Sequence, residues 1–341
     1  MPDPSMPATG ATSAKEWMTV LSKYREPNTA RASFELAVTV GAFVSLWALA
    51  WYVMATSALL TFLISLCNAA FLLRLFCIQH DCGHSAFLKN RVLSDWLGRA
   101  LGVVTLTPYD VWRRSHAIHH SASGNLGRRG IGDVNTLTVA EYQGRTPFKR
   151  LMYRLYRHPL VLFGLGPGYL FFLQNRLPLG LAGQAKYWVS SMGTNAVLFL
   201  ALSIIFYFGG VMPILLIFLP STLLAATAGV WLFYVQHQFE ETHWEEAQAW
   251  DLHDAALHGS SHYVLPPVLQ WLSANIGIHH VHHLYSRIPF YRLTEVLRDH
   301  HDLAVSNRMT IRESLQTVRL HLWDEDSKRL VSFKTARGLS A

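Results

Sequence analysis

The chain has few charged residues and few cysteines, and both shortages limit the class of protein that it can be. Only 15% of its 341 residues are charged, whereas a soluble globular domain has roughly 25%. Its hydrophobic share is 51%, and its mean hydropathy is positive at +0.19. The three cysteines, Cys67, Cys77 and Cys82, are odd in number and imply no disulfide framework, which fits a reducing compartment. The composition therefore indicates a membrane protein.

Several familiar signals for cofactors and partners are also missing. The sequence has no haem-attachment motif, no flavin fingerprint and no cysteine set for an iron–sulfur cluster, so any electrons that it uses must come from a separate donor. Its net charge of +7 is spread along the chain, and we expect no nucleic-acid partner. The polar, proline-containing N-terminus does not have the pattern of a cleavable signal. We expect residues 1–30 to be a disordered or interfacial segment.

Four stretches are apolar enough to cross a membrane as helices. They cover about residues 34–54, 57–78, 187–208 and 211–235, and each has the length of about 20 residues that a spanning helix needs. The links within the first and second pairs are very short, which predicts two helical hairpins. Residues 97–106 and 159–173 are apolar but too short or too broken to span, and we expect them at the interface. Glycine and proline in the second of these oppose a continuous helix.

The positions of lysine and arginine predict the orientation of these spans. Four precede residue 34, fourteen lie between the second and third spans, ten follow the fourth, Arg74 lies inside the second, and the two hairpin tips have none. Loops rich in lysine and arginine stay on the cytoplasmic side of a membrane. Both termini and the long middle loop should therefore be cytoplasmic.

The 18 histidines are concentrated in clusters beside the predicted spans. Residues 80–84 read HDCGH, residues 116–120 read HAIHH and residues 279–283 read HHVHH. Spacings of three and four residues place side chains on one face of a helix. His237 ends the fourth span on the same side, whereas His280 is out of phase with its neighbours. The predicted metal ligands are His80, His84, His116, His119, His120, His237, His279, His282 and His283.

Nine imidazoles are too many for one ion but suit two ions with four or five ligands each. Zinc normally takes four ligands, and imidazole also suits iron, so the set favours two irons and the activation of dioxygen. Carboxylates that accept the other ring N–H commonly hold such histidines in place. The candidates are Asp81, Asp133, Glu240 and Glu241, for which ordinary surface charge is the alternative.

The three clusters resemble the histidine boxes of the membrane fatty acid desaturase family. The matching segments are HDCGHSAF (80–87), HAIHH (116–120) and HHVHH (279–283), supported by SGNLGRRGIGD (123–133), WLFYVQHQFEE (231–241) and NIGIHHVHHL (275–284). The resemblance runs from about residue 34 to about residue 294 and is nearest to bacterial acyl-lipid desaturases. It implies an all-α membrane protein with four transmembrane helices in two hairpins. A single domain, residues 31–341, would place cytoplasmic regions 79–186 and 236–341 in a helical cap around a di-iron site.

The same resemblance implies an O₂-dependent oxidoreductase of unsaturated fatty acid biosynthesis. It would introduce a cis double bond into the acyl chains of lipids in the bacterial inner membrane, using two non-haem iron ions and electrons from ferredoxin or flavodoxin. His237 matches the additional ligand of the family, but Phe233 stands about where acyl-CoA desaturases have a ligating asparagine. The alternatives are a related hydroxylase of a lipid, alkane or carotenoid and, less favoured, a metal transporter. The position of the double bond, the acyl carrier and the oligomeric state are left open.

Overall fold

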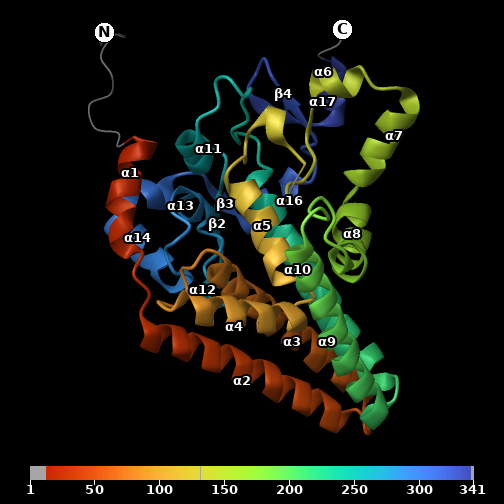
Figure 1. Ribbon diagram of the computed structural model, residues 1–341. Coiled ribbons are helices and arrows are strands. Elements are labelled where there is room, and N and C mark those ends of the chain that lie inside the picture. The colour runs from red at the N-terminus through yellow and green to blue at the C-terminus, as the bar shows by residue number, and fades with distance from the viewer. Residues whose placement is uncertain (1–12, 131, 339–341) are drawn as a thin grey trace.

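The computed structural model describes residues 13–130 and 132–338, which are mostly helical (Figure 1). Four long helical segments within this part are apolar enough to cross a membrane. They are α2 (Thr29–Val53), α3 (Ala58–Gly83), α9 (Ala185–Gly209) and a fourth in which the π-helical turn η5 (Ile214–Phe218) leads into α10 (Leu219–His237). The four spans predicted from hydropathy are thus found, with the two short links in the expected places.

The first hairpin is formed by α2 and α3, which pack along each other. Each helix begins at a side-chain cap, because the side chain of Asn28 accepts a hydrogen bond from the N–H of Arg31 and that of Ser57 accepts one from Leu60. The other face of α3 packs against α10. Helix α3 is therefore covered on two sides, which fits its buried polar residues.

Two helices widen into π-helical turns shortly before a proline. In the fourth span η5 precedes Pro220, and in the segment that we expected to be broken η3 (Leu160–Leu165) precedes Pro167 and runs directly into α8 (Gly166–Phe172). Proline lacks an N–H and crowds the preceding turn, and a π-helical turn accommodates both effects. The expectation that residues 159–173 cannot form a continuous helix was therefore wrong.

The third span packs mainly on helices outside the set of four spans. Helix α9 packs on α4 (Arg91–Val104) and α5 (Tyr109–His120), and it meets the fourth span at η5. Helix α4 exposes Val92, Leu93 and Trp96 and carries its charged residues at positions 91, 95 and 99, which spacings of four place along one face, so it is amphipathic. Its location at the membrane interface stays a prediction.

Short helices and two small sheets surround the ends of the spans. The strands form the orders β1-β4-β5 and β2-β3, with β1–β4 and β2–β3 parallel and β4–β5 antiparallel. The predicted all-α membrane fold is confirmed as a mostly helical one. The strands of two or three residues are too short to show a periodic pattern in the sequence. The strands are β1 (Leu137–Thr138), β2 (His262–Val264), β3 (Arg308–Thr310), β4 (Leu322–Asp324) and β5 (Arg329–Val331). The remaining helices of six or more residues are α1 (Ala14–Leu21), α7 (Pro147–Tyr156), α11 (Leu252–His258), α12 (Pro267–Leu272), α13 (His279–Leu284), α14 (Leu293–Asp299), α16 (Ile311–Thr317) and α17 (Phe333–Gly338), and the five-residue helices are α6 (Val139–Gln143) and α15 (His301–Val305).

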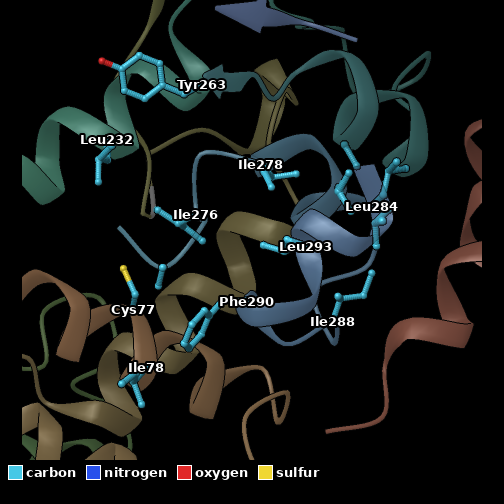
Figure 2. Packing of buried hydrophobic residues seen from close by; sticks show 14 of the residues in the cluster. Cys77, Ile78, Leu232, Tyr263, Ile276, Ile278, Leu284, Ile288, Phe290 and Leu293 are labelled. Atoms are coloured by element: carbon cyan, nitrogen blue, oxygen red, sulfur yellow. The ribbon is translucent and has the colours of Figure 1, made fainter. Parts of the chain in front are cut away.

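A buried apolar cluster joins the second span to the C-terminal region. Cys77 and Ile78 of α3 lie in this cluster with Ile276, Ile278 and Phe290, which flank α13 on both sides (Figure 2). All five side chains are at most 9% exposed. Burial of this apolar surface holds α13 against the end of α3, and this brings the first and third histidine clusters together.

The N-terminal segment is more ordered than the sequence suggested. Helix α1 has a complete capping box at Ser13 and buries Trp17 and Leu21. The Trp17 ring lies 5.3 Å from the ring of His300, between centroids, and α1 contacts α11 and α13. The expected disorder is therefore wrong for α1, while the disorder expected for residues 1–12 lies outside the described residues. An interfacial location and a domain boundary at residue 31 stay predictions.

Candidate metal centre

The predicted ligands lie where four helices end or meet. His80 occupies the last turn of α3, which continues five residues beyond the predicted end of the span, and His84 is its C-terminal cap. His237 is the last residue of α10. Helix α5 carries the second cluster near its C-terminus, and the six-residue helix α13 carries the third. The ends of two long apolar helices thus position three of the nine histidines.

The nine histidines gather in two groups that cut across the sequence clusters. In each group, one nitrogen of every ring lies within 4.8 Å of the corresponding nitrogens of the other rings. Successive residues of a helix are rotated by about 100°, so His119 and His120 face different groups although they are neighbours in sequence. The first group is His80, His84, His116, His120 and His282, and the second is His119, His237, His279 and His283.

The distances between ring nitrogens fit ions held between the rings. In the first group Nε2 of His116 lies 3.0 Å from Nε2 of His80 and 3.1 Å from Nε2 of His120. In the second, Nε2 of His237 lies 3.1 Å from that of His119 and 3.0 Å from that of His279. Imidazole nitrogens bind metals at roughly 2.1 Å, which puts ligands at right angles about 3.0 Å apart and tetrahedral ligands about 3.4 Å apart. The observed spacing is nearer to the right-angled arrangement.

Two further nitrogens at the centre lack any hydrogen-bond partner. Nε2 of His84 and Nε2 of His283 are both buried and unpaired among the described residues. A buried polar atom without a partner is costly. A metal ion in each group would satisfy these atoms, so the residues present fit a pair of ions.

Burial keeps five of these histidine rings uncharged. Loss of hydration and then the neighbouring imidazoles hold the pKa of His116, His120 and His282 well below the usual range. The pKa values of His279 and His283 are lowered for the same reasons. These rings are thus uncharged at neutral pH and keep a lone pair for a metal, because a protonated ring cannot bind one.

Two hydrogen bonds on the outer side of the rings set which nitrogen faces the centre. Nδ1 of His119 donates to the Asp133 carboxylate, and Nδ1 of His237 donates to the carbonyl oxygen of Gly259 at 3.1 Å. With the proton on Nδ1, the lone pair of each ring is on Nε2 and points into the second group. The role predicted for Asp133 thus has a structural basis.

The other carboxylates that the sequence suggested differ in their surroundings. Asp81 is buried, lies 3.4 Å from Nδ1 of His80 and accepts the backbone N–H of Phe290 at 2.7 Å. Glu240 and Glu241 are exposed, and Glu240 lies 3.4 Å from Arg329. These two glutamates therefore hold no histidine ring and are surface charges, which was the alternative for them.

A model of the fatty acid desaturase family matches residues 57–314, a stretch that contains all nine histidines. The chain belongs to this family. It is 42% identical over 319 residues to the fatty acid desaturase of Bacillus subtilis, covering 93% of this chain and 90% of that protein. It is 26% identical over 281 residues to an sn-1 acyl-lipid omega-3 desaturase (ferredoxin) of Synechocystis sp., covering 79% and 74%. An sn-1 oleoyl-lipid 12-desaturase of the same organism is 26% identical over 238 residues, covering 64% and 62%.

Two aromatic side chains form walls of this desaturase centre. The Phe233 ring lies one turn before His237, and its centroid is 5.1 Å from that of His119. Trp112 stacks on His116 with centroids 4.7 Å apart and planes at 16°. The sequence analysis did not single out Trp112, although its position four residues before His116 on a helix places the two rings together.

His280 lies outside both groups, as its phase on the helix indicates. Its Nε2 donates to the carbonyl oxygen of Leu303 at 2.8 Å, so the ring joins α13 to α15. Burial, followed by the nearby His262, lowers the pKa of His280 to about 3. Asn275, the first residue of the NIGIHHVHHL segment, donates its side-chain N–H to the carbonyl of Phe290 at 3.0 Å. Both residues therefore have structural partners.

Proposed function

We propose that this protein introduces a cis double bond into acyl chains of membrane lipids, with two iron ions held by the nine histidines. The observation that carries the proposal is the meeting of nine imidazoles in two adjacent groups at the ends of apolar helices. The names of the two Synechocystis relatives support lipid-bound acyl chains as substrates. Those relatives differ in where they place the double bond, so the position is not carried over to this chain.

The reaction takes one hydrogen from each of two neighbouring carbons. Overall, –CH₂–CH₂– with O₂, two electrons and two protons gives –CH=CH– and two waters. Bound iron supplies the redox chemistry with O₂ that this dehydrogenation requires. The hydrogen bonds made by His119 and His237 keep donor nitrogens aimed inward, and burial keeps rings such as that of His282 uncharged. Trp112 and Phe233 cover ring faces and limit the access of water to the centre.

The charge distribution supports a location in the bacterial inner membrane with the histidines facing the cytoplasm. The lysines and arginines lie in the termini and the middle segment and are missing from both hairpin links. An acyl chain would then reach the centre from the inner leaflet without crossing water. We propose ferredoxin or flavodoxin as the electron donor, and the ferredoxin named for one relative supports the first of these.

The test is gas chromatography–mass spectrometry of membrane fatty acids from bacteria that express the chain. We expect a new unsaturated fatty acid with the wild type and none with His282→Ala, which lacks a nitrogen of the first group. His301→Ala is the matched control, because this exposed residue belongs to neither group. A hydroxylated fatty acid instead of an alkene would replace the proposal by a hydroxylase. Full desaturation by His282→Ala would contradict the ligand assignment.

A further inference from the structure

A recess of about 380 Å³ opens beside the first histidine group. His84 and His116 line it, together with three arginines, Arg91, Arg113 and Arg287. The arginines come from separate parts of the chain: the start of α4, the middle of α5 and the segment that follows α13. Three segments thus bring positive charge to one small space next to the metal centre.

Most of this positive charge is not neutralised. Arg113 lies 2.9 Å from Asp95, which also accepts a hydrogen bond from the hydroxyl of Tyr109 at 2.8 Å. Arg91 and Arg287 are exposed and have no ion pair in the described part of the chain. One carboxylate therefore faces three guanidinium groups, and the recess favours an anion.

The surface next to Arg91 indicates where that anion comes from. Val92, Leu93 and Trp96 follow on the first turns of α4 and are 68%, 58% and 64% exposed. An amphipathic helix with such a face lies in the membrane interface, with basic residues at the depth of the lipid head groups. The positive side of the recess is therefore expected to border the layer of lipid phosphates.

We propose that this recess binds the phosphate of a phospholipid substrate, which makes a phosphoglyceride the acyl carrier. The inference rests on the proposed desaturase function and names its substrate class. Arginine suits this role, because the planar guanidinium group donates paired hydrogen bonds to phosphate oxygens. The volume suits a lipid head group. Binding there would fix the glycerol end of the lipid beside His84 and His116 while an acyl chain enters the centre.

The first experiment measures binding, which needs neither electrons nor O₂. Purified protein in an uncharged detergent is titrated with dioctanoyl phosphatidylglycerol by isothermal calorimetry. The double variant R91Q/R287Q should bind on the order of tenfold or more weakly, because charge-assisted hydrogen bonds are lost. Arg312→Gln should bind like the wild type, because Arg312 is exposed on α16 and does not line the recess. Equal affinity of the double variant and the wild type would overturn the proposal.

Two further titrations identify the source of the phosphate. Dioctanoylglycerol, which has no phosphate, should bind the double variant and the wild type equally. Oleoyl-CoA should compete only weakly with phosphatidylglycerol. If instead the double variant no longer bound oleoyl-CoA but still bound the phospholipid, the acyl carrier would be a CoA thioester. That result would contradict the assignment of a phospholipid as substrate.

Turnover then separates this site from the desaturase function itself. The double variant should raise the KM for phosphatidylglycerol and leave kcat and the KM for reduced ferredoxin near the wild-type values. A rise confined to the KM for ferredoxin would assign the recess to the electron donor and overturn the proposal. Phosphate-dependent binding without any double bond in the product would contradict the proposed function and leave the anion site standing.

Discussion

At the residue scale, the centre depends on which way each imidazole of a short segment points. His119 and His120 are adjacent, yet Nε2 of His119 lies 3.1 Å from that of His237 and Nε2 of His120 lies 3.1 Å from that of His116. The rings of His120 and His283, from opposite groups, stack with centroids 4.1 Å apart. The two candidate ion sites are thus separate in their ligands and in contact through their rings.

This arrangement predicts that His119→Ala and His120→Ala each weaken one ion site. Iron per protein, measured by inductively coupled plasma mass spectrometry, should fall from about two to about one in either variant. Desaturation should fall at least a hundredfold, because the chemistry uses both ions. His301→Ala should keep the wild-type iron content. A variant of His119 or His120 with two firmly held irons would contradict the assignment of that residue.

Asp133 should act on the second group through His119. Asp133→Asn replaces an acceptor of the Nδ1–H bond by an amide, and loss of such a partner typically lowers metal affinity by about 10- to 100-fold. We expect that loss for one of the two ions in a titration with a competing chelator. Asp254→Asn, an exposed carboxyl on α11, should leave both affinities unchanged. Equal weakening of both ions by Asp133→Asn would point to a general loss of folding.

The sequence identifies which histidines form the centre but not which of them belong to each of the two groups. Spacings of three and four select His116, His119 and His120 and leave out His280, because helix geometry is local. The division into five and four depends on how α5 and α13 approach each other, which is a tertiary property. The exposure of Glu240 and Glu241 is likewise not predictable, because the direction of the chain after His237 is not visible in the sequence.

At the element scale, a buried arginine ties the first hairpin to the segments around the third histidine cluster. Arg74 of α3 pairs with Glu35 of α2 and donates to the carbonyl of Trp271 in α12. Its guanidinium carbon lies 4.0 Å from the centre of the Trp271 ring and 5.2 Å from that of Phe290. Arg74 and Glu35 are each 1% exposed. The sequence places Arg74 inside a span but does not reveal its partners.

Removal of one partner should cost far more than removal of both. Arg74→Met leaves the Glu35 carboxylate buried beside only Arg31, and such a broken pair typically costs about 3–5 kcal/mol. The double variant Arg74→Met/Glu35→Leu should recover a large part of that loss. Unfolding in detergent, followed by circular dichroism, measures both effects. A double variant less stable than Arg74→Met alone would contradict this account.

The sequence predicts an element well where the pattern that indicates it extends over many residues. Runs of about 20 apolar residues identify the spans within a few residues of their ends, because the thickness of the membrane sets their length. The π-helical turns before Pro167 and Pro220 and strands such as β1 escape such an analysis. A strand such as β1 forms by pairing with β4, which is distant in sequence, and a π-helical turn before a proline leaves the hydropathy of the segment unchanged.

At the scale of the whole molecule, α1 and α17 lie on the same side as the histidine-bearing ends of the spans (Figure 1). The charge distribution predicts that this side faces the cytoplasm. Green fluorescent protein fused after Ala341 should therefore fluoresce, and alkaline phosphatase fused within the link after Gly210 should be active. Green fluorescent protein fused after Gly210 should not fluoresce, and alkaline phosphatase fused after Ala341 should be inactive. The reverse pattern would place the metal centre outside the cell and exclude ferredoxin as donor.

The division of α13 between the two groups also has a consequence for synthesis of the protein. Nε2 of His282 lies 3.2 Å from that of His120, which precedes it by 162 positions, and His279 and His283 belong to the other group. Neither group is complete until the ribosome has passed α13, and by then all four spans have been made. A complete set of ligands for either ion would therefore form only after every membrane span has been synthesised.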